Sequence, residues 1–88
     1  MNIQELNEMI KELHSVADEL EGRLPAINIQ FFRDFIEHNE LGIGVEILLE
    51  QIYENDIVLS KMSYYILKNA SKAMKVDDDL FIGVKHNE

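Results

Sequence analysis

Cysteine and tryptophan are absent from this chain of 88 residues, and proline occurs once. Without cysteine there is no disulfide framework and no thiolate chemistry, which fits a reducing compartment. No apolar run approaches the roughly 18 residues that a membrane-spanning helix needs, and the first residues lack the basic and apolar segments of a signal peptide. We therefore expect a cytoplasmic protein that forms one small domain over residues 1–88.

Basic residues are also scarce. Eight Lys and Arg stand against 17 Asp and Glu, for a net charge of -9. This charge argues against nucleic acids and anionic membranes as ligands, because both are polyanions. No Lys or Arg lies between Arg33 and Lys61, where the chain carries seven carboxylates. These are Asp34, Glu37, Glu40, Glu46, Glu50, Glu54 and Asp56. Because charges of one sign repel each other in the folded state, we interpret them as a binding surface for a basic partner; a merely solvated acidic face is the simpler alternative.

Apolar residues at spacings of three and four predict a first helix over Ile3–Leu20. Asn2 and Glu5 form a capping-box pattern at its start. Gly22 suits the left-handed conformation just beyond its end.

A second helix is predicted to carry Pro25 in its first turn, where the missing N–H has no cost. Asn39 and Gly42 mark the break that follows it. Its inward face is expected to be a wide aromatic stripe, formed by Ile29, Phe32 and Ile36 with Phe31 and Phe35 beside them.

The third helix has the clearest pattern. Its inward face is expected to hold Val45, Leu48, Leu49, Ile52 and Tyr53. Glu46, Glu50 and Glu54 fall at i, i+4 and i+8 and so form one outward row, which we call the acidic ridge. Like charges at this spacing each cost a few tenths of a kcal/mol in an isolated helix, and no lysine is interleaved. We expect the ridge to meet the basic partner, with Tyr53 as a buried anchor at the centre of the interface.

Ser60 is a good N-cap for a fourth helix that runs to about Lys75. Ile57–Leu59 is too short to make a sheet alone, Asp77–Asp79 favours a short C-terminal turn or helix, and the end from Lys85 is expected to fray. The predicted architecture is all-α: a compact antiparallel bundle of four helices plus a short C-terminal helix.

Groupings typical of catalysis are missing from the sequence. His14, His38 and His86 have no partners at metal-ligand spacing. Asp77–Asp79 lacks the alternating acids and the glycine of a calcium loop, and the glycines at 42 and 44 lack the rest of a dinucleotide fingerprint. We expect no enzymatic activity, no cofactor and no metal.

Four segments also carry a family likeness: Asp34–Gly42, Val45–Glu54, Ile57–Ser60 and Tyr64–Met74. Together they resemble the MafI-type immunity proteins of bacterial polymorphic-toxin systems, which are similar to contact-dependent inhibition systems. Members often have Cys at Leu49, Pro at Val58 and Trp near Phe81, so this chain departs from the pattern there. The resemblance implies a small helical protein that binds and neutralises the C-terminal domain of a cognate toxin, a basic domain that is often a nuclease.

The residues expected to contact the toxin are Asp34, Glu37, Glu40, Glu46, Glu50, Tyr53, Glu54 and Asp56. Plugging of the active site and binding beside it are both compatible with the sequence. The main alternative is an acidic adaptor or regulator that binds another basic protein through the same surface. A second alternative is self-association through an exposed patch of Phe31, Phe35 and Tyr65.

Overall fold

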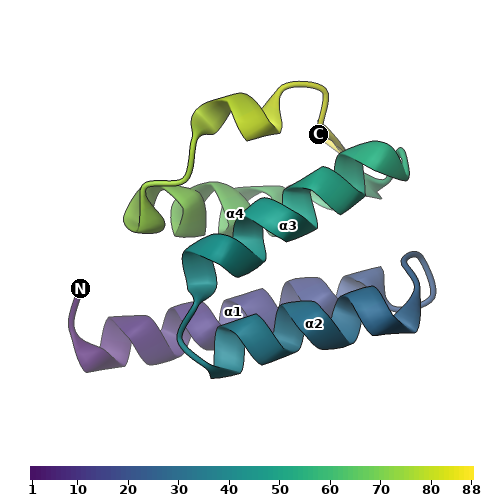
Figure 1. The fold of residues 1–88 in the computed structure, drawn as a ribbon. Helices are drawn as coiled ribbons and strands as arrows, with labels where there is room; N and C mark the ends of the chain where they lie inside the picture. Colours follow the sequence, from purple (N-terminus) through teal and green to yellow (C-terminus); the bar gives the residue numbers. More distant parts are fainter.

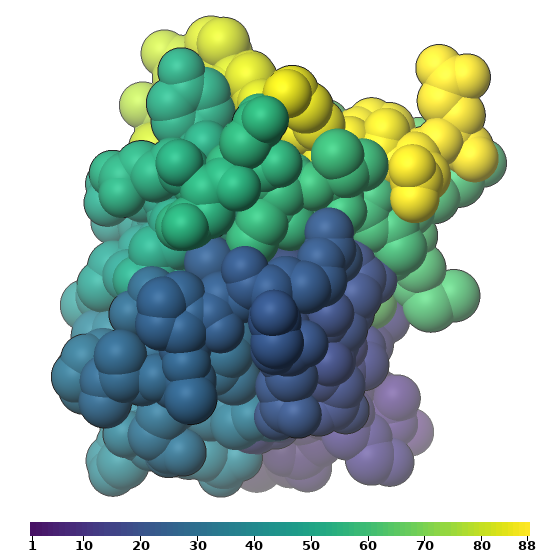
Figure 2. All heavy atoms as spheres, turned by 90° about the vertical axis from the view of Figure 1, so that its right-hand side faces the viewer, coloured from purple at the N-terminus to yellow at the C-terminus, as the bar shows by residue number.

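The computed structural model describes all 88 residues, of which 70% are helical. The four helices are α1 (Ile3–Leu20), α2 (Ala26–Glu37), α3 (Leu41–Glu54) and α4 (Lys61–Met74). In Figure 1, α1 and α2 lie side by side in a lower layer, and α3 and α4 lie above them. Figure 2 shows the same division from the side, with the N-terminal half below and the C-terminal half above. The four predicted helices are confirmed, whereas their arrangement as a regular antiparallel bundle stays a prediction.

Local capping interactions set the helix ends. The capping box of α1 is confirmed, because the Glu5 backbone N–H donates to Asn2 Oδ1 at 2.8 Å and the Asn2 N–H donates to the Glu5 side chain. Gly22 has the expected positive φ of 81°. Pro25 stands one residue earlier than predicted, as the N-cap of α2. Ser60 caps α4 through its hydroxyl, which accepts the Ser63 N–H at 3.1 Å.

The core is one cluster of 19 buried residues to which all four helices contribute. On α1 the predicted apolar stripe is buried as expected from Leu13 onward, whereas Ile3 in the first turn is 76% exposed. Val16 is buried as well, so the apolar face of α1 is wider than its regular spacing suggests. On α2 the residues Ile29, Phe32 and Ile36 are buried as predicted.

The connection between α2 and α3 is shorter than predicted. The break occurs at Asn39, which has a φ of 62°, and α3 begins at Leu41, so Gly42 is helical and does not mark the break. Gly44 lies in the first turn of α3, where a Cβ atom would come within 3.0 Å of the Phe35 Cβ. The glycine therefore serves the close approach of α3 to α2 rather than a loop.

The C-terminal residues are ordered against the helices, which corrects the expectation of a frayed end from Lys85. Of the two forms predicted after Asp77, a turn or a short helix, the structure has a single 3-10 turn. A 3-10 helix, η1 (Asp78–Phe81), is followed by the strand β2 (Lys85–His86), which pairs in parallel with β1 (Val58–Leu59). The His86 ring stacks on Tyr64 with centroids 3.8 Å apart. The short strand at β1 thus finds a partner 27 residues away in the sequence, which local patterns could not indicate.

A polar cluster joins α1 to the start of α4. The carboxylate of Glu19 accepts the Ser60 N–H at 3.0 Å, the Ser63 hydroxyl at 2.8 Å and the Ser60 hydroxyl. Arg23 forms an ion pair with Glu19 and donates to the Val58 carbonyl. The N-cap of α4 is therefore itself held by a side chain from α1.

Candidate functional site

The acidic ridge lies on the solvent side of α3. Val45, Leu48, Leu49 and Ile52 are each 0% exposed and bind α3 to the core. An α-helix has 3.6 residues per turn, so the face opposite these buried residues points to the solvent. Glu46, Glu50 and Glu54 lie on that face and are all exposed. None of the three forms an ion pair or a side-chain hydrogen bond within the protein. The outward position of the ridge, predicted from spacing, is confirmed.

Tyr53 is 60% exposed, so its predicted place on the inward face of α3 is wrong. The ring lies against the C-terminal residues: a Cβ atom at Gly83 would come within 2.6 Å of the Tyr53 Cε1. Residues 45, 48, 49 and 52 already fill the inward face, and residue 53 falls at its edge. Tyr53 is therefore free to meet a partner with one side of the ring while the other side covers Gly83.

Asp56 is less isolated than the sequence suggests. It follows α3 in a turn with a φ of 53°, and its carboxylate accepts a hydrogen bond from the Lys85 Nζ at 2.6 Å. The lysine comes from β2, far from the lysine-free segment in the sequence. Both side chains are more than half exposed, so this ion pair contributes little to stability.

Glu37, at the end of α2, also has a partner. Arg33 donates to His14 Nδ1 at 2.8 Å, which places the ring proton on Nε2, 2.6 Å from Glu37 Oε1. Arg33 donates further to Asp18 at 2.6 Å and Glu21 at 3.1 Å. The hydrogen bond to Asp18 raises the pKa of Arg33, burial partly opposes this, and Glu21 raises the pKa further.

Asp18 and Glu21 thus form ion pairs with Arg33, the basic residue nearest in sequence to the acidic segment. The carboxylate of Asp34 on α2 accepts a hydrogen bond only from the side-chain amide of Gln30, at 2.9 Å, and the Glu40 side chain has no partner. The eight predicted contact residues therefore divide into the α3 group, with Tyr53 and Asp56, and a group at the α2–α3 corner.

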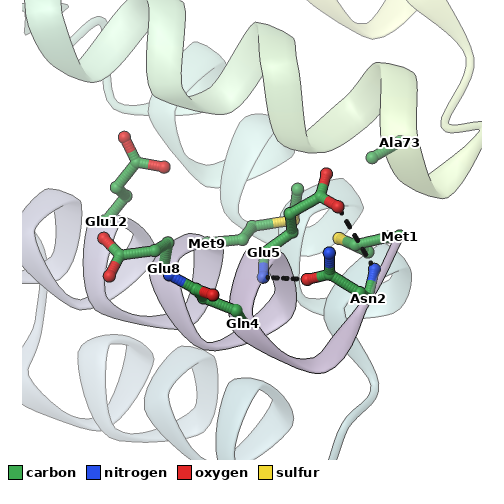
Figure 3. Close-up of a pocket in the computed structure, with 8 residues that line it drawn as sticks. All are labelled: Met1, Asn2, Gln4, Glu5, Glu8, Met9, Glu12 and Ala73. Carbon is green, nitrogen blue, oxygen red and sulfur yellow. Dashed lines mark hydrogen bonds between the residues drawn. The ribbon is translucent and has the colours of Figure 1, made fainter.

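An open hollow of about 610 Å³ lies between the start of α1 and Ala73 of α4 (Figure 3). Three glutamates line it, of which Glu5 is used by the capping box. No histidine, serine or lysine faces these carboxylates. In the whole chain, no three His, Asp or Glu side chains form a group that could hold a metal ion.

Sequence reasoning did not identify a hollow at the α2–α3 corner that is lined by Phe31, Asp34, Phe35, His38 and Glu40. The signal was present, because positions 31, 34, 35 and 38 share one face of a helix. From the sequence, Phe31 and Phe35 are expected beside an inward aromatic stripe, and only the self-association alternative puts them on the surface. In the structure Phe31 is 52% exposed.

No protein-family model, no curated protein and no solved structure matches this chain in the comparisons. None of the four helices combines the length and the apolar character that a membrane-spanning helix requires. The fold and surface define a small four-helix protein whose α3 carries a row of uncompensated carboxylates.

Proposed function

We propose that this protein is an immunity protein that binds the C-terminal domain of a cognate toxin, a basic domain of nuclease type, and neutralises it. The observation that carries the proposal is the acidic ridge, whose three carboxylates lack any cation of the protein itself. Like charges in a row destabilise the free helix slightly, so a basic partner would relieve a repulsion that the fold leaves in place.

The ridge suits inhibition of a nuclease because the active site of such an enzyme is a basic cleft that holds phosphates. A helix that presents carboxylates can occupy this cleft or cover its approach. Long-range attraction would raise the association rate, which reaches on the order of 10⁸ M⁻¹s⁻¹ in electrostatically steered complexes. A standard interface would cover about 800 Å² of the 5525 Å² surface.

In this proposal the protein acts in the cytoplasm without a cofactor and has no catalytic activity of its own. The four helices form an antiparallel bundle that holds α3 rigid, so little ordering entropy is lost on binding. Tyr53 supplies an aromatic contact beside the ridge, and Asp34, Glu37, Glu40 and Asp56 extend the acidic surface.

The test is calorimetric binding to the purified C-terminal domain of the large protein encoded immediately upstream, at low and at high salt. We expect nanomolar affinity that weakens with salt. Charge reversal of the ridge, with Glu46, Glu50 and Glu54 changed to Lys, is expected to weaken binding and protection while the helical circular dichroism stays unchanged.

The matched control reverses three exposed carboxylates outside the ridge, with Glu8, Glu12 and Glu88 changed to Lys, so that the net charge changes equally. Equal weakening by both variants would show that only net charge matters and would remove the ridge from the interface. Failure to bind the toxin domain would contradict the immunity role and leave the acidic adaptor of another basic protein, which would use the same surface.

A further inference from the structure

The α2–α3 corner carries an aromatic and acidic hollow that is separate from the acidic ridge. Its volume is about 390 Å³, and the five side chains that line it are those of Phe31, Asp34, Phe35, His38 and Glu40. We call it the corner hollow. Glu40 immediately precedes α3, so the hollow lies about 9 Å along the helix from Glu46, at a rise of about 1.5 Å per residue.

We infer that the corner hollow receives an arginine side chain of the basic partner. This inference rests on the proposed function and extends it, because it assigns the anchor of the interface to the corner hollow rather than to Tyr53. Three features of the hollow select a guanidinium group: its charge, its aromatic walls and its free acceptor atoms.

The hollow contains acids but no cation. No Lys or Arg lines it, and neighbouring Arg33 is held by Asp18, Glu21 and His14 on the α1 side. One carboxylate oxygen of Asp34 accepts a hydrogen bond from Gln30, and neither carboxylate oxygen of Glu40 has a partner in the protein. An apolar side chain placed here would remove these carboxylates from water without compensation, whereas a cation would pair with them.

Aromatic rings make arginine a better occupant than lysine. A guanidinium is planar, so it can stack on an aromatic face and donate N–H groups to carboxylates in its own plane. It is also less strongly hydrated than an ammonium group and loses less on entering a partly closed site. Phe31 is 52% exposed, and its ring is available for this contact.

His38 adds an acceptor. Its Nδ1 is 2.8 Å from the Asp34 carbonyl oxygen, so Nδ1 carries the proton that the carbonyl accepts. In the neutral ring Nε2 is then an acceptor, which suits the many donors of a guanidinium. Phe35, which lines the hollow, is held in place because it packs against Gly44 of α3.

The first test uses the protein alone. Isotope-labelled full-length chain is titrated with N-acetyl-arginine amide and, as a neutral isostere, with N-acetyl-citrulline amide, both at constant ionic strength. We expect saturable shifts of the Phe31, Phe35 and His38 ring signals with the arginine compound only. The shifts should disappear in a variant that carries Asp34→Asn and Glu40→Gln. Equal responses to both compounds, or shifts confined to the acidic ridge, would overturn the inference.

The second test uses the complex with the toxin domain. Phe31→Ala is expected to weaken binding about tenfold, as for an interface anchor, and Ile27→Ala, one turn earlier on α2 and 57% exposed, by less than about threefold. Both variants should keep the wild-type unfolding temperature. If the wild-type complex is tight and Phe31→Ala binds equally well, the corner hollow is not the anchor of the interface, and the immunity role remains intact. Absence of any complex would instead overturn the immunity role, and the arginine titration would still decide whether the hollow binds a guanidinium.

Discussion

Glu19 is the most connected carboxylate of the molecule, and its side chain is only 25% exposed. Burial by itself raises the pKa of Glu19, but hydrogen bonds from Ser60 and Ser63 and the charge of Arg23 outweigh burial and lower the pKa below its ordinary value. The charged form is therefore the one that the fold stabilises.

Neutralising this group should change both the stability and its pH dependence. Glu19→Gln is expected to lower the free energy of unfolding by about 1–3 kcal/mol at neutral pH, because the amide cannot accept from all of the same donors. The unfolded chain binds a proton at higher pH than the folded one, so the contribution of Glu19 is complete above the unfolded pKa and is lost as pH falls toward the folded pKa. Urea unfolding from neutral pH to about pH 3 should thus show a smaller acid loss in the variant.

A suitable control for Glu19→Gln is Glu8→Gln, since Glu8 is exposed on the same helix and has no ion pair. It should leave the acid dependence as in the wild type. If the two variants lost stability in parallel on acidification, the hydrogen bonds to Ser60 and Ser63 would not favour the charged carboxylate.

Ile52 tests the inward face of α3. It is 0% exposed, so Ile52→Ala should lower the free energy of unfolding by about 2–5 kcal/mol through lost burial and a cavity. Ile43→Ala on the same helix is the control, because Ile43 is 48% exposed and its truncation should change stability by no more than about 0.5 kcal/mol. Denaturant unfolding measures both, and similar small losses would contradict the orientation of α3.

At the scale of elements, the start of α3 shows how two glycines of one helical turn differ. A Cβ at Gly42 would meet Met74 at 3.7 Å, an ordinary contact, whereas a Cβ at Gly44 would meet the Phe35 Cβ at 3.0 Å. The Phe35 Cβ is fixed to the backbone of α2 and cannot rotate away. Relief at Gly44 therefore requires the two helices to move apart.

Gly42→Ala should stabilise the protein by up to about 1 kcal/mol, because alanine loses less backbone entropy in a helix. Gly44→Ala should instead destabilise it, because overpacking costs about 1–3 kcal/mol and exceeds the same gain. Thermal or urea unfolding of the two variants shows directly whether each substitution stabilises or destabilises the protein. A stabilising Gly44→Ala would mean that α2 and α3 are not held at this close distance.

Sequence patterns that span only a few residues predicted the four helices and several of their ends. The capping pattern at Asn2, the N-cap at Ser60 and the periodicity of α3 each depend on residues a few positions apart. Contacts between distant segments were not predicted, because no local pattern encodes them. The parallel pairing of Val58 with Lys85 and the packing of Tyr53 on Gly83 are of this kind.

The same distinction applies to the candidate site. Helical spacing was enough to place Glu46, Glu50 and Glu54 outward, and the structure confirms this. The cation that pairs with Asp56 comes from far along the chain, since it is Lys85. The corner hollow needs the turn of the chain at Asn39, which brings Glu40 beside the exposed face of α2.

At the scale of the whole molecule, charge is distributed unevenly. Arg23, Arg33, Lys68 and Lys85 form ion pairs with acids on α1, on η1 and in the turn after α3. Three of the acids so paired are Asp18, Asp56 and Asp78. The ridge receives no such partner. Neutralising the ridge acids should therefore stabilise the protein and neutralising the paired acids should not, although each triple change makes the net charge of -9 less negative by three.

Neutralising the ridge, with Glu46, Glu50 and Glu54 changed to Gln, is expected to raise the free energy of unfolding by about 0.4–1 kcal/mol at low salt, because two like-charge pairs at i, i+4 are removed. The gain should vanish near 1 M salt, where the Debye length is about 3 Å. Neutralising Asp18, Asp56 and Asp78 to Asn should lower stability or leave it unchanged, since exposed ion pairs contribute about 0–1 kcal/mol each. Urea unfolding at both salt concentrations compares the two variants. Equal stabilisation by both would attribute the effect to net charge, and the ridge would then carry no repulsion of its own for a basic partner to relieve.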